Sequence, residues 1–553
     1  MVVLLQTKSK KIDNKMKNTN PIFSLKNFRS FGEDGADFEL APITVLTGCN
    51  SAGKSSLVKA LMLLSNQLTD KFKQIPTGIT GVNRLQPSTL LNTSIKELKL
   101  GGFDNVINEK AKAGELSISY RIWSNYLQEN IVCRRVFHTL KGVLNYGGLS
   151  WLSIEKIDGT IIYRTSPYTT AELIDLGGHY QECEIEHMKE EEHFEAIEEK
   201  YQNFKLACVF DELSKDIDLM EGLTSKQKLP KENRLEECKA AYEQVKEQLG
   251  SVSLNDYDEA TIHQWNERWD VIFQRRNEME RMYFEDRTME EQDEDDKELF
   301  YTLVINEVVS PWFIKTLNFI DSSTNEIRRV YNVDNKDKLS ALLYSLSMRS
   351  QSSASYQTGH FVNKWLEKFG IGNRIVIVGS DEWLGVKVYL EENGVKRLLA
   401  DEGCGITQLI SILLQIELTS NKYYKETEDG EYKKSKHVIC IEEPEVHLHP
   451  KYQSLLAEMF VEAYQKYNIH FIIETHSEYL IRKLQVMVAD KANALTANDV
   501  SLNYVEKDKN GTSHNRQIKI IEDGRLSEPF GPGFFDEATG LSMHLLKMKM
   551  EAK

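Results

Sequence analysis

The chain has 553 residues, of which 41% are hydrophobic and 27% are charged, a composition typical of a globular protein with several domains. Its formal net charge of -16 at pH 7 argues against a surface that is basic throughout, so contact with nucleic acid would need a local Lys/Arg patch or a partner that carries one. The seven cysteines include no C-x-x-C pair, which fits neither a disulfide framework nor a zinc knuckle and predicts a reducing, cytoplasmic environment.

The N-terminal residues 1–20 predict a disordered tail. The segment "MVVLLQTKSKKIDNKMKNTN" has only a short apolar start before its lysines and asparagines, too short for a signal peptide. No later run approaches about 18 consecutive apolar residues, the length that predicts a membrane-spanning helix. We therefore expect a cytoplasmic protein without membrane contact.

Residues 21–180 predict a β-rich lobe with one early helix at 55–68. Short strand-like segments are expected at 22–31, 38–48, 100–107, 115–123 and 159–166. Between a strand and the helix, "GCNSAGKSS" fits G-x-x-x-x-G-K-[ST] through Gly48, Gly53, Lys54 and Ser55. In that motif backbone N–H groups cradle phosphates, the lysine reaches the β/γ oxygens and the hydroxyl meets Mg²⁺. The segment therefore predicts a site for a nucleoside triphosphate with Mg²⁺.

Residues 181–300 predict an acidic helical insertion. Segments such as "NRLEECKAAYEQVKEQL" are dense in Glu and Lys at helical spacing, but the heptads are too few and irregular for a long coiled coil. Two interpretations stay open, a solvated helical face and an arm that docks a partner.

Residues 301–535 predict the second half of an α/β fold, and 536–553 predict a C-terminal helix. Strand signals alternate with helical patterns, the strands at 373–380, 385–394, 437–445 and 469–477 and the helices at 404–418, 453–467 and 478–488. Such alternation predicts a mainly parallel sheet covered by helices.

Two strand ends in this half carry candidate catalytic residues. The apolar run "VICI" leads into Glu442 and Glu443. In a P-loop protein the first acid would serve the Mg²⁺ shell, and the second would orient or deprotonate the attacking water. His476 ends the next strand and is a candidate contact for the γ-phosphate or that water, although a lone histidine is more often structural. The H-x-H spacing of His447 and His449 suggests zinc, but no further ligand cluster lies near in sequence, which favours loop residues at a subunit seam.

Four segments resemble the ABC-type ATPase heads of the group that includes the SMC, Rad50, RecF and OLD-family proteins. These are "FSLKNFRSFG" with "ITVLTGCNSAGKSSLVKALMLL", "LLADEGCGITQLISILL", "VICIEEPEVHLHPKYQSLLAEMF" and "IIETHSEYLI". The closing "IIEDGRLSEPFGPGFFDEATGLSMHLL" resembles the C-terminal segment of bacterial AAA-type ATPases that carry the domain of unknown function DUF3696. The resemblance implies an α/β fold, an ABC-type P-loop ATPase head with a mixed or parallel sheet, flanking helices and a β-rich lobe. It does not extend to the helical insertion.

The resemblance also implies residue roles. ATP would bind to the Walker A loop, which includes Asn50, Ser51, Ala52, Gly53, Lys54, Ser55 and Ser56, with Ser55 and Glu442 around Mg²⁺. Glu443 and His476 would be catalytic, and 445–449 would be the D-loop. The segment 401–408 would be the signature motif, in which Gly403, Gly405, Thr407 and Gln408 cap the ATP of the opposite subunit. Small residues there let the backbone approach a phosphate closely.

Three departures from the family pattern bear on turnover. The common L-S-G-G-Q wording is absent, Glu442 replaces the usual Asp, and no sure Q-loop glutamine is found near "LKLGGFDNVI". We expect slow hydrolysis, as suits a switch.

The resemblance implies a cytoplasmic homodimeric ATPase whose heads close on two ATP molecules and gate a separate effector. Related ATPases in the anti-phage systems Septu, PARIS and retron modules hold or release a nuclease or toxin. The segment after His476 lacks the acidic D-x-D cluster of OLD-family nucleases, so we expect the effector in another chain. The alternative is a DNA repair or recombination ATPase that binds duplex DNA on its closed heads. A transporter motor fits poorly, because Lys54 and 401–408 are unusually far apart in sequence.

Overall fold

The computed structural model describes most of the chain. The described residues are 20–69, 73–76, 83–86, 90–95, 98–111, 114–140, 143–166, 189–208, 239–240, 242, 262, 289–321, 328–331, 338–347, 355–379, 385–420, 424–426, 432–434, 436–531 and 534–551. The predicted tail, apart from Asn20, and much of the predicted insertion 181–300 lie outside these ranges. No helix in the described part combines the length and the apolar content needed to cross a membrane.

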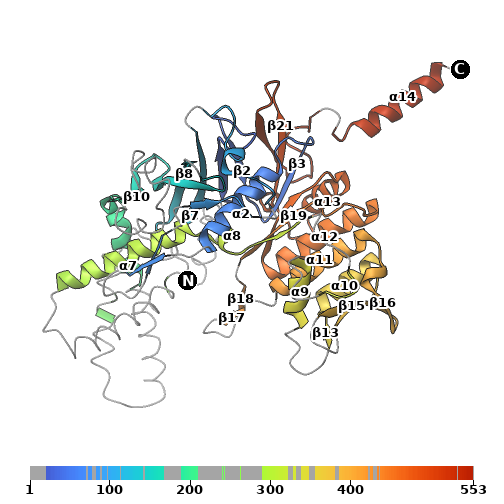
Figure 1. Ribbon diagram of the computed structural model, residues 1–553, viewed down its shortest axis with the longest axis horizontal. Coiled ribbons are helices and arrows are strands. Elements are labelled where there is room, and N and C mark those ends of the chain that lie inside the picture. The colour runs from blue at the N-terminus through green and yellow to red at the C-terminus, as the bar shows by residue number, and fades with distance from the viewer. Residues whose placement is uncertain are drawn as a thin grey trace, which may run out of the picture. The chain divides into compact units, whose positions relative to one another are not determined.

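The chain divides into two compact units, whose elements can be followed by colour in Figure 1. The described residues of the first unit come from Gln67–Leu91 and Ser117–Pro311. The second unit consists of Asn20–Asn66, Asn92–Leu116 and Trp312–Lys553. The nucleotide-binding motif and the paired acids both fall in the second unit, although almost 400 residues separate them in the sequence.

The first unit is built on an antiparallel meander. The meander consists of β7 (Glu115–Ser124), β8 (Glu129–Thr139), β9 (Tyr146–Lys156), β10 (Ile161–Ser166) and β11 (Lys189–Glu192), and β6 (Leu90–Asn92) pairs with β9. The strands β4 (Lys73–Pro76) and β5 (Asn83–Gln86) form a separate antiparallel pair, and the long helix of the unit is α7 (Met289–Val309). Strand β7 alternates buried and more exposed residues, as expected for a sheet with one apolar face. Strand β11 pairs with β10, so the segment 181–300, predicted as helical, contains a strand at that place.

The second unit contains a six-stranded sheet in the order β12-β19-β20-β3-β21-β22. The strands are β12 (Leu317–Ile320), β19 (His437–Glu442), β20 (Ile469–Glu474), β3 (Ile43–Gly48), β21 (Val500–Lys507) and β22 (Ser513–Ile518). The first five run parallel, and β22 is antiparallel to β21. All six residues of β3 are buried, which explains the nearly continuous apolar run in this strand. The predicted α/β fold with a mainly parallel sheet is confirmed.

Two predicted strands lie outside this sheet. Residues 373–380 and 385–394 give β14 (Arg374–Gly379) and β15 (Val386–Glu392), which belong to an antiparallel sheet with β13 (Ser355–Gln357) and β16 (Val395–Leu398). Asn393 and Gly394 both have positive φ and form a two-residue hairpin turn, which returns the chain antiparallel instead of through a crossover helix. The predicted strand at 100–107 is also wrong, because η3 (Phe103–Asn105) forms a 3-10 turn there.

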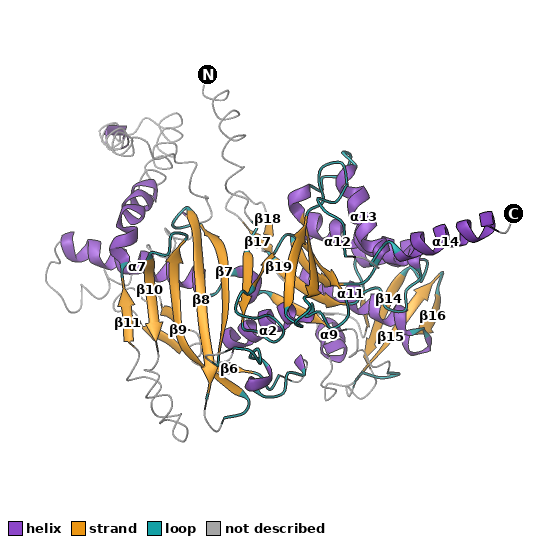
Figure 2. Ribbon diagram, turned by 90° about the horizontal axis from the view of Figure 1, so that it is seen from above, coloured by secondary structure: helices purple, strands orange, loops and turns teal. Residues whose placement is uncertain are grey.

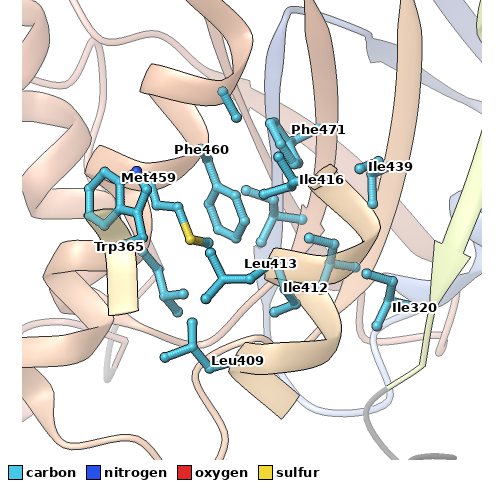
Figure 3. Packing of buried hydrophobic residues seen from close by; sticks show 14 of the residues in the cluster. Ile320, Trp365, Leu409, Ile412, Leu413, Ile416, Ile439, Met459, Phe460 and Phe471 are labelled. Atoms are coloured by element: carbon cyan, nitrogen blue, oxygen red, sulfur yellow. The ribbon is translucent and has the colours of Figure 1, made fainter. Parts of the chain in front are cut away.

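One face of the parallel sheet packs against helices in a continuous core. Ile439 and Phe471 from the sheet, Leu413 from α11 (Cys404–Ser420), Phe460 from α12 (Pro450–Tyr467) and Trp365 from α10 (His360–Phe369) are fully buried in it, as Figure 3 shows. Helices α11 and α12 lie against β20, which is the neighbour of the strand labelled β19 in Figure 2. Because strand side chains alternate between faces, the residues next to these core positions point to the opposite face of the sheet.

The remaining described elements of the second unit are helices, turns and two antiparallel strand pairs that lie outside the two sheets described above. They are β1 (Ile22–Lys26), β2 (Ala36–Glu39), α2 (Ser55–Thr69), α8 (Trp312–Lys315), α9 (Lys338–Ser347), η6 (Leu399–Asp401), β17 (Tyr424–Glu426), β18 (Tyr432–Lys434), α13 (Glu478–Ala489), η7 (Ala497–Asp499) and α14 (Glu537–Glu551). Helix α14 lies within the predicted C-terminal helix 536–553.

Candidate nucleotide site

The loop between β3 and α2 has the strand–loop–helix setting that the motif requires, and it contains two glycines that no other residue could replace without strain. Gly48 has φ +132°, and a Cβ added to it would lie 2.0 Å from the carbonyl oxygen of Val505 on β21. Gly53 has φ +103°, and its Cβ would lie 2.5 Å from Ser30 Oγ. The glycines therefore allow a backbone path that side chains would block.

Lys54 is buried within this loop. Its Nζ donates hydrogen bonds to the carbonyl oxygens of Gly48 at 3.3 Å and Cys49 at 3.0 Å. Burial lowers the pKa of Lys54, while Glu474 and Glu443 oppose that shift. The loop thus holds an ammonium group in place before any ligand is present, as a phosphate-binding lysine requires.

A cavity of about 290 Å³ opens beside the loop. It is lined by Arg29, Ser30, Ser51, Gly53, Lys54, Ser55, Ser56, Lys59, Glu474 and Lys507. Four cationic side chains face a single carboxylate there, a balance that suits a polyanion. The sequence predicted Lys54 but missed Arg29, Lys59 and Lys507. Lys507 ends β21, the neighbour of β3, so only the strand order reveals it.

A row of carboxylates ends three adjacent strands beside the loop. Glu442 on β19 and Glu474 on β20 are register partners, and Asp321 follows Ile320, the partner of Ile441. The core residues Ile441 and Ile473 precede the two glutamates, so both carboxylates point to the other face of the sheet. The pKa of Glu442 is raised to about 7, first by burial of its carboxylate and then by charge repulsion from Glu474 and Asp321.

The P-loop serine is already bound to one of these acids. Ser55 Oγ donates a hydrogen bond to Glu474 Oε1 at 3.0 Å. The sequence prediction paired Ser55 with Glu442 around Mg²⁺ and did not consider Glu474. Burial also raises the pKa of Glu474, and the Ser55 hydrogen bond and Lys54 oppose that shift.

The predicted catalytic pair lies in the same region. Glu443 has φ +45°, and its amide donates to the carbonyl oxygen of Glu474 at 2.7 Å. The amide of His476 donates to Glu445 Oε1 at 2.7 Å, which ties the two strand ends together and leaves the imidazole exposed. Partial desolvation by the surrounding protein, followed by the nearby Lys54, lowers the pKa of His476, so the neutral ring prevails at pH 7.

The predicted signature segment 401–408 runs from the end of η6 into α11 and packs on the predicted D-loop, 445–449, of its own chain. Gly405 is buried, and a Cβ there would lie 2.6 Å from the carbonyl oxygen of His447. Gln408 Nε2 donates to the carbonyl oxygen of Glu443 at 3.0 Å, and Thr407 is buried. Gly403 is exposed, with no heavy atom within 4 Å of an added Cβ. None of these four residues lines the cavity beside the P-loop.

The two histidines of the H-x-H motif have ordinary structural roles or surface positions. His449 is the N-cap of α12, where Nδ1 accepts a hydrogen bond from the amide of Lys451 at 3.3 Å. His447 is exposed and has φ +62°. Within the described residues, no group of three or more His, Cys, Asp or Glu side chains is arranged to hold a metal ion alone.

The residues present fit a nucleotide with Mg²⁺. Ser56 Oγ and Glu474 Oε2 are buried without hydrogen-bond partners among the described residues, so the site has unused polar atoms. Mg²⁺ in nucleotide sites takes few protein ligands and depends on phosphate oxygens, so a serine hydroxyl and a nearby carboxylate are a sufficient protein contribution. Ser55 and the neighbouring carboxylates would hold the ion, and Lys54 would contact phosphate.

A P-loop between a central strand and a helix, with acids at the ends of neighbouring parallel strands, defines a P-loop nucleoside triphosphatase. The chain matches the AAA ATPase domain over residues 22–481 and the protein of unknown function DUF3696 over residues 495–545. It therefore belongs to the AAA ATPase domain family, and the ATPase family and the DUF3696-like C-terminus predicted from the sequence are confirmed.

Solved structures of SMC head domains are similar to this chain at low identity. A head domain from Pyrococcus furiosus, bound to the C-terminal domain of ScpA, has a TM-score of 0.34 at 11% identity and covers 90% of this chain and 96% of its own. The SMC head domain from Thermotoga maritima has a TM-score of 0.33 at 10% identity and covers 90% and 97%. No curated protein matches the chain.

Proposed function

We propose that this AAA-family ATPase is a nucleotide-gated switch, in which two heads close on two ATP molecules and control a separate effector. The observation that supports it most directly is the P-loop cavity, where four cationic side chains and one buried carboxylate surround Ser55. The effector would be a nuclease or toxin of a bacterial anti-phage system, as the resemblance to such ATPases suggests. The proposed cofactors are ATP and Mg²⁺.

The proposed hydrolysis assigns separate tasks to the acids and the histidine. Lys54 would bind phosphate, and Ser55 with the nearby carboxylates would hold Mg²⁺, whose chemistry is to neutralise charge on the phosphates. Glu443 would orient or deprotonate the attacking water. A neutral His476, with its ring exposed and its backbone held by Glu445, would donate a hydrogen bond toward the γ-phosphate.

The proposed dimer relies on the segment 401–408. Gly403 is exposed at the start of the 17-residue helix α11, so its backbone and the helix N-terminus are open to an approaching phosphate. Because the segment does not line the cavity of its own chain, a phosphate would have to come from a second copy. Its contact with Glu443 through Gln408 and its contact with the proposed D-loop through Gly405 would report nucleotide state from one site to the other.

The test measures ATP turnover and the distance between heads labelled with paired spin probes. Glu443→Gln should trap ATP and shorten that distance. Gly403→Arg should abolish the ATP-dependent shortening while each chain still binds ATP. Gly405→Arg is a poorer probe, because even a Cβ at that position would collide with the backbone of His447 in the same chain. Closure that ignores ATP, or that survives Gly403→Arg unchanged, would refute the dimeric switch.

A second measurement tests the effector. The parent and Glu443→Gln proteins are purified from the native host, and co-purifying proteins and nucleic acids are identified. We expect a nuclease or toxin whose association changes with the nucleotide state. Recovery of duplex DNA with a steep salt dependence, and of no effector, would favour the DNA repair alternative.

A further inference from the structure

Glu474 is a buried carboxylate with one satisfied oxygen and one unsatisfied oxygen. The residue is 6% exposed. Its Oε1 accepts the Ser55 hydroxyl at 3.0 Å, whereas Oε2 is buried without a hydrogen-bond partner among the described residues. An unpaired buried carboxylate oxygen carries a desolvation cost that a bound cation would remove.

The strand order places Glu474 nearer to the P-loop than Glu442. Strand β20 is the direct neighbour of β3, and Glu474 pairs with Leu46, two residues before Gly48. Glu442 lies on β19, one strand further away, a lateral step of about 4.8 Å. A cation that touches Ser55 Oγ therefore meets Glu474 first.

Within the described part of the chain, no cationic side chain donates a hydrogen bond to Glu474, whose Oε1 accepts only the Ser55 hydroxyl. Lys54, the nearest P-loop cation, donates to the carbonyl oxygens of Gly48 and Cys49. Among the carboxylates, Glu474 nevertheless does most to raise the pKa of Lys54, ahead of Glu443. The carboxylate thus lies within the field of the phosphate-binding lysine while one of its oxygens remains available.

We propose that Glu474, together with the Ser55 hydroxyl, is the residue that positions the divalent cation of the bound nucleotide, and that Glu442 occupies a more distant place. The cation class is a hard divalent ion such as Mg²⁺ or Mn²⁺, which prefers carboxylate and hydroxyl oxygens. The inference rests on the proposed function, because it requires nucleotide in the P-loop cavity.

A purely structural role for Glu474 makes a different prediction. In that case the carboxylate only ties β20 to α2 through Ser55, and Glu474→Gln preserves the bond because its amide oxygen still accepts the hydroxyl proton. Metal-free nucleotide binding separates the two roles further. Removal of a negative charge beside Lys54 should tighten the binding of a metal-free triphosphate, whereas loss of a cation position should weaken the binding of the metal complex.

The experiment has two titrations. The first measures the affinity for Mn²⁺ by electron paramagnetic resonance, with protein and the non-hydrolysable analogue AMP-PNP present. The second measures the affinity for fluorescent ATP in EDTA, without metal. The variants are Glu474→Gln, Glu474→Asp and Glu442→Gln. The matched control is Glu417→Gln, a carboxylate of equal burial on α11 that accepts the Gly359 amide at 2.9 Å. We expect Glu474→Gln to weaken Mn²⁺ binding by about 10- to 100-fold, as for other residues that orient metal ligands. The Mn²⁺ affinity of Glu474→Asp should lie between the affinities of Glu474→Gln and the parent, and the Mn²⁺ affinity of Glu417→Gln should equal that of the parent.

The outcomes separate the inference from the proposed function. Equal Mn²⁺ affinity in Glu474→Gln and the parent, or a larger loss in Glu442→Gln, would overturn the inference while ATP binding stands. A parent protein that binds no nucleotide with or without metal would overturn both. If Glu474→Gln does not fold, Glu474→Asp provides the test. The inference requires Glu474→Asp to bind Mn²⁺ more weakly than both the parent and Glu417→Gln, and equal affinity would overturn it.

Discussion

The substitution Gly48→Ala should disable the nucleotide site by displacing the backbone of a neighbouring strand. The added Cβ would lie 2.0 Å from Val505 O, and that atom is backbone in a parallel ladder, so no side-chain rotation can relieve the contact. The strands must separate by about 1.4 Å for this contact to reach the 3.4 Å of an ordinary van der Waals contact, which costs about 1–3 kcal/mol as overpacking. The φ of +132° adds about 1–3 kcal/mol of backbone strain. We therefore expect the substitution to lower the free energy of unfolding by about 2–6 kcal/mol in total.

The control for this prediction is Gly370→Ala. Gly370 also has positive φ, +67°, but an added Cβ would have no heavy atom within 4 Å, so the substitution carries backbone strain alone. Hydrogen–deuterium exchange reports local opening of β3 and β21, and fluorescent ATP reports binding. Gly48→Ala should speed exchange in both strands and abolish ATP binding, whereas Gly370→Ala should leave both nearly unchanged. Equal effects of the two substitutions would refute the close-approach argument.

Three further predictions concern charge in the site. Lys54→Ala should weaken ATP binding by about 10- to 100-fold, because it removes a charge-assisted contact, and unchanged affinity in calorimetry would contradict the P-loop assignment. Glu443→Gln should still bind ATP while turnover falls by about 10² to 10⁴, measured as phosphate release, and near-normal turnover would place the catalytic base elsewhere. Glu442 has a folded-state pKa of about 7, above its ordinary value, so the metal-free protein should lose stability as pH rises from about 4.5 through 7. Thermal unfolding across this range should show a smaller loss for Glu442→Gln than for the parent, and parallel curves would contradict the raised pKa.

Local patterns were sufficient to predict the P-loop and the paired acids. Gly48, Gly53, Lys54 and Ser55 lie within eight consecutive residues, and the strand and helix that present them flank the loop directly. Glu442 follows an apolar run of strand length, so its place at a strand end could also be read from the sequence. Both predictions needed only short-range information.

Two of the site residues absent from the sequence prediction, Lys507 and Glu474, depend on which strands are neighbours. Lys507 joins the site because β21 pairs with β3, and Glu474 joins it because β20 lies on the other side. One signal was available, since "IHFIIE" ends in an acid just as "HVICIE" does. The antiparallel hairpin of β15 and β16 departs from the predicted crossover because Asn393 and Gly394 both adopt positive φ and turn the chain back within two residues.

The central position of β3 has a consequence for synthesis of the chain. Its two partners, Ile469–Glu474 and Val500–Lys507, are translated more than 400 residues later. At about 5–20 residues per second, the nascent chain carries an unpaired P-loop strand for roughly 20–90 s. During that interval the apolar run Ile43–Gly48 is a target for chaperones and for wrong strand pairing, and the P-loop cannot be held in its binding conformation. Nucleotide binding is thereby reserved for chains whose translation has passed the last of these strands.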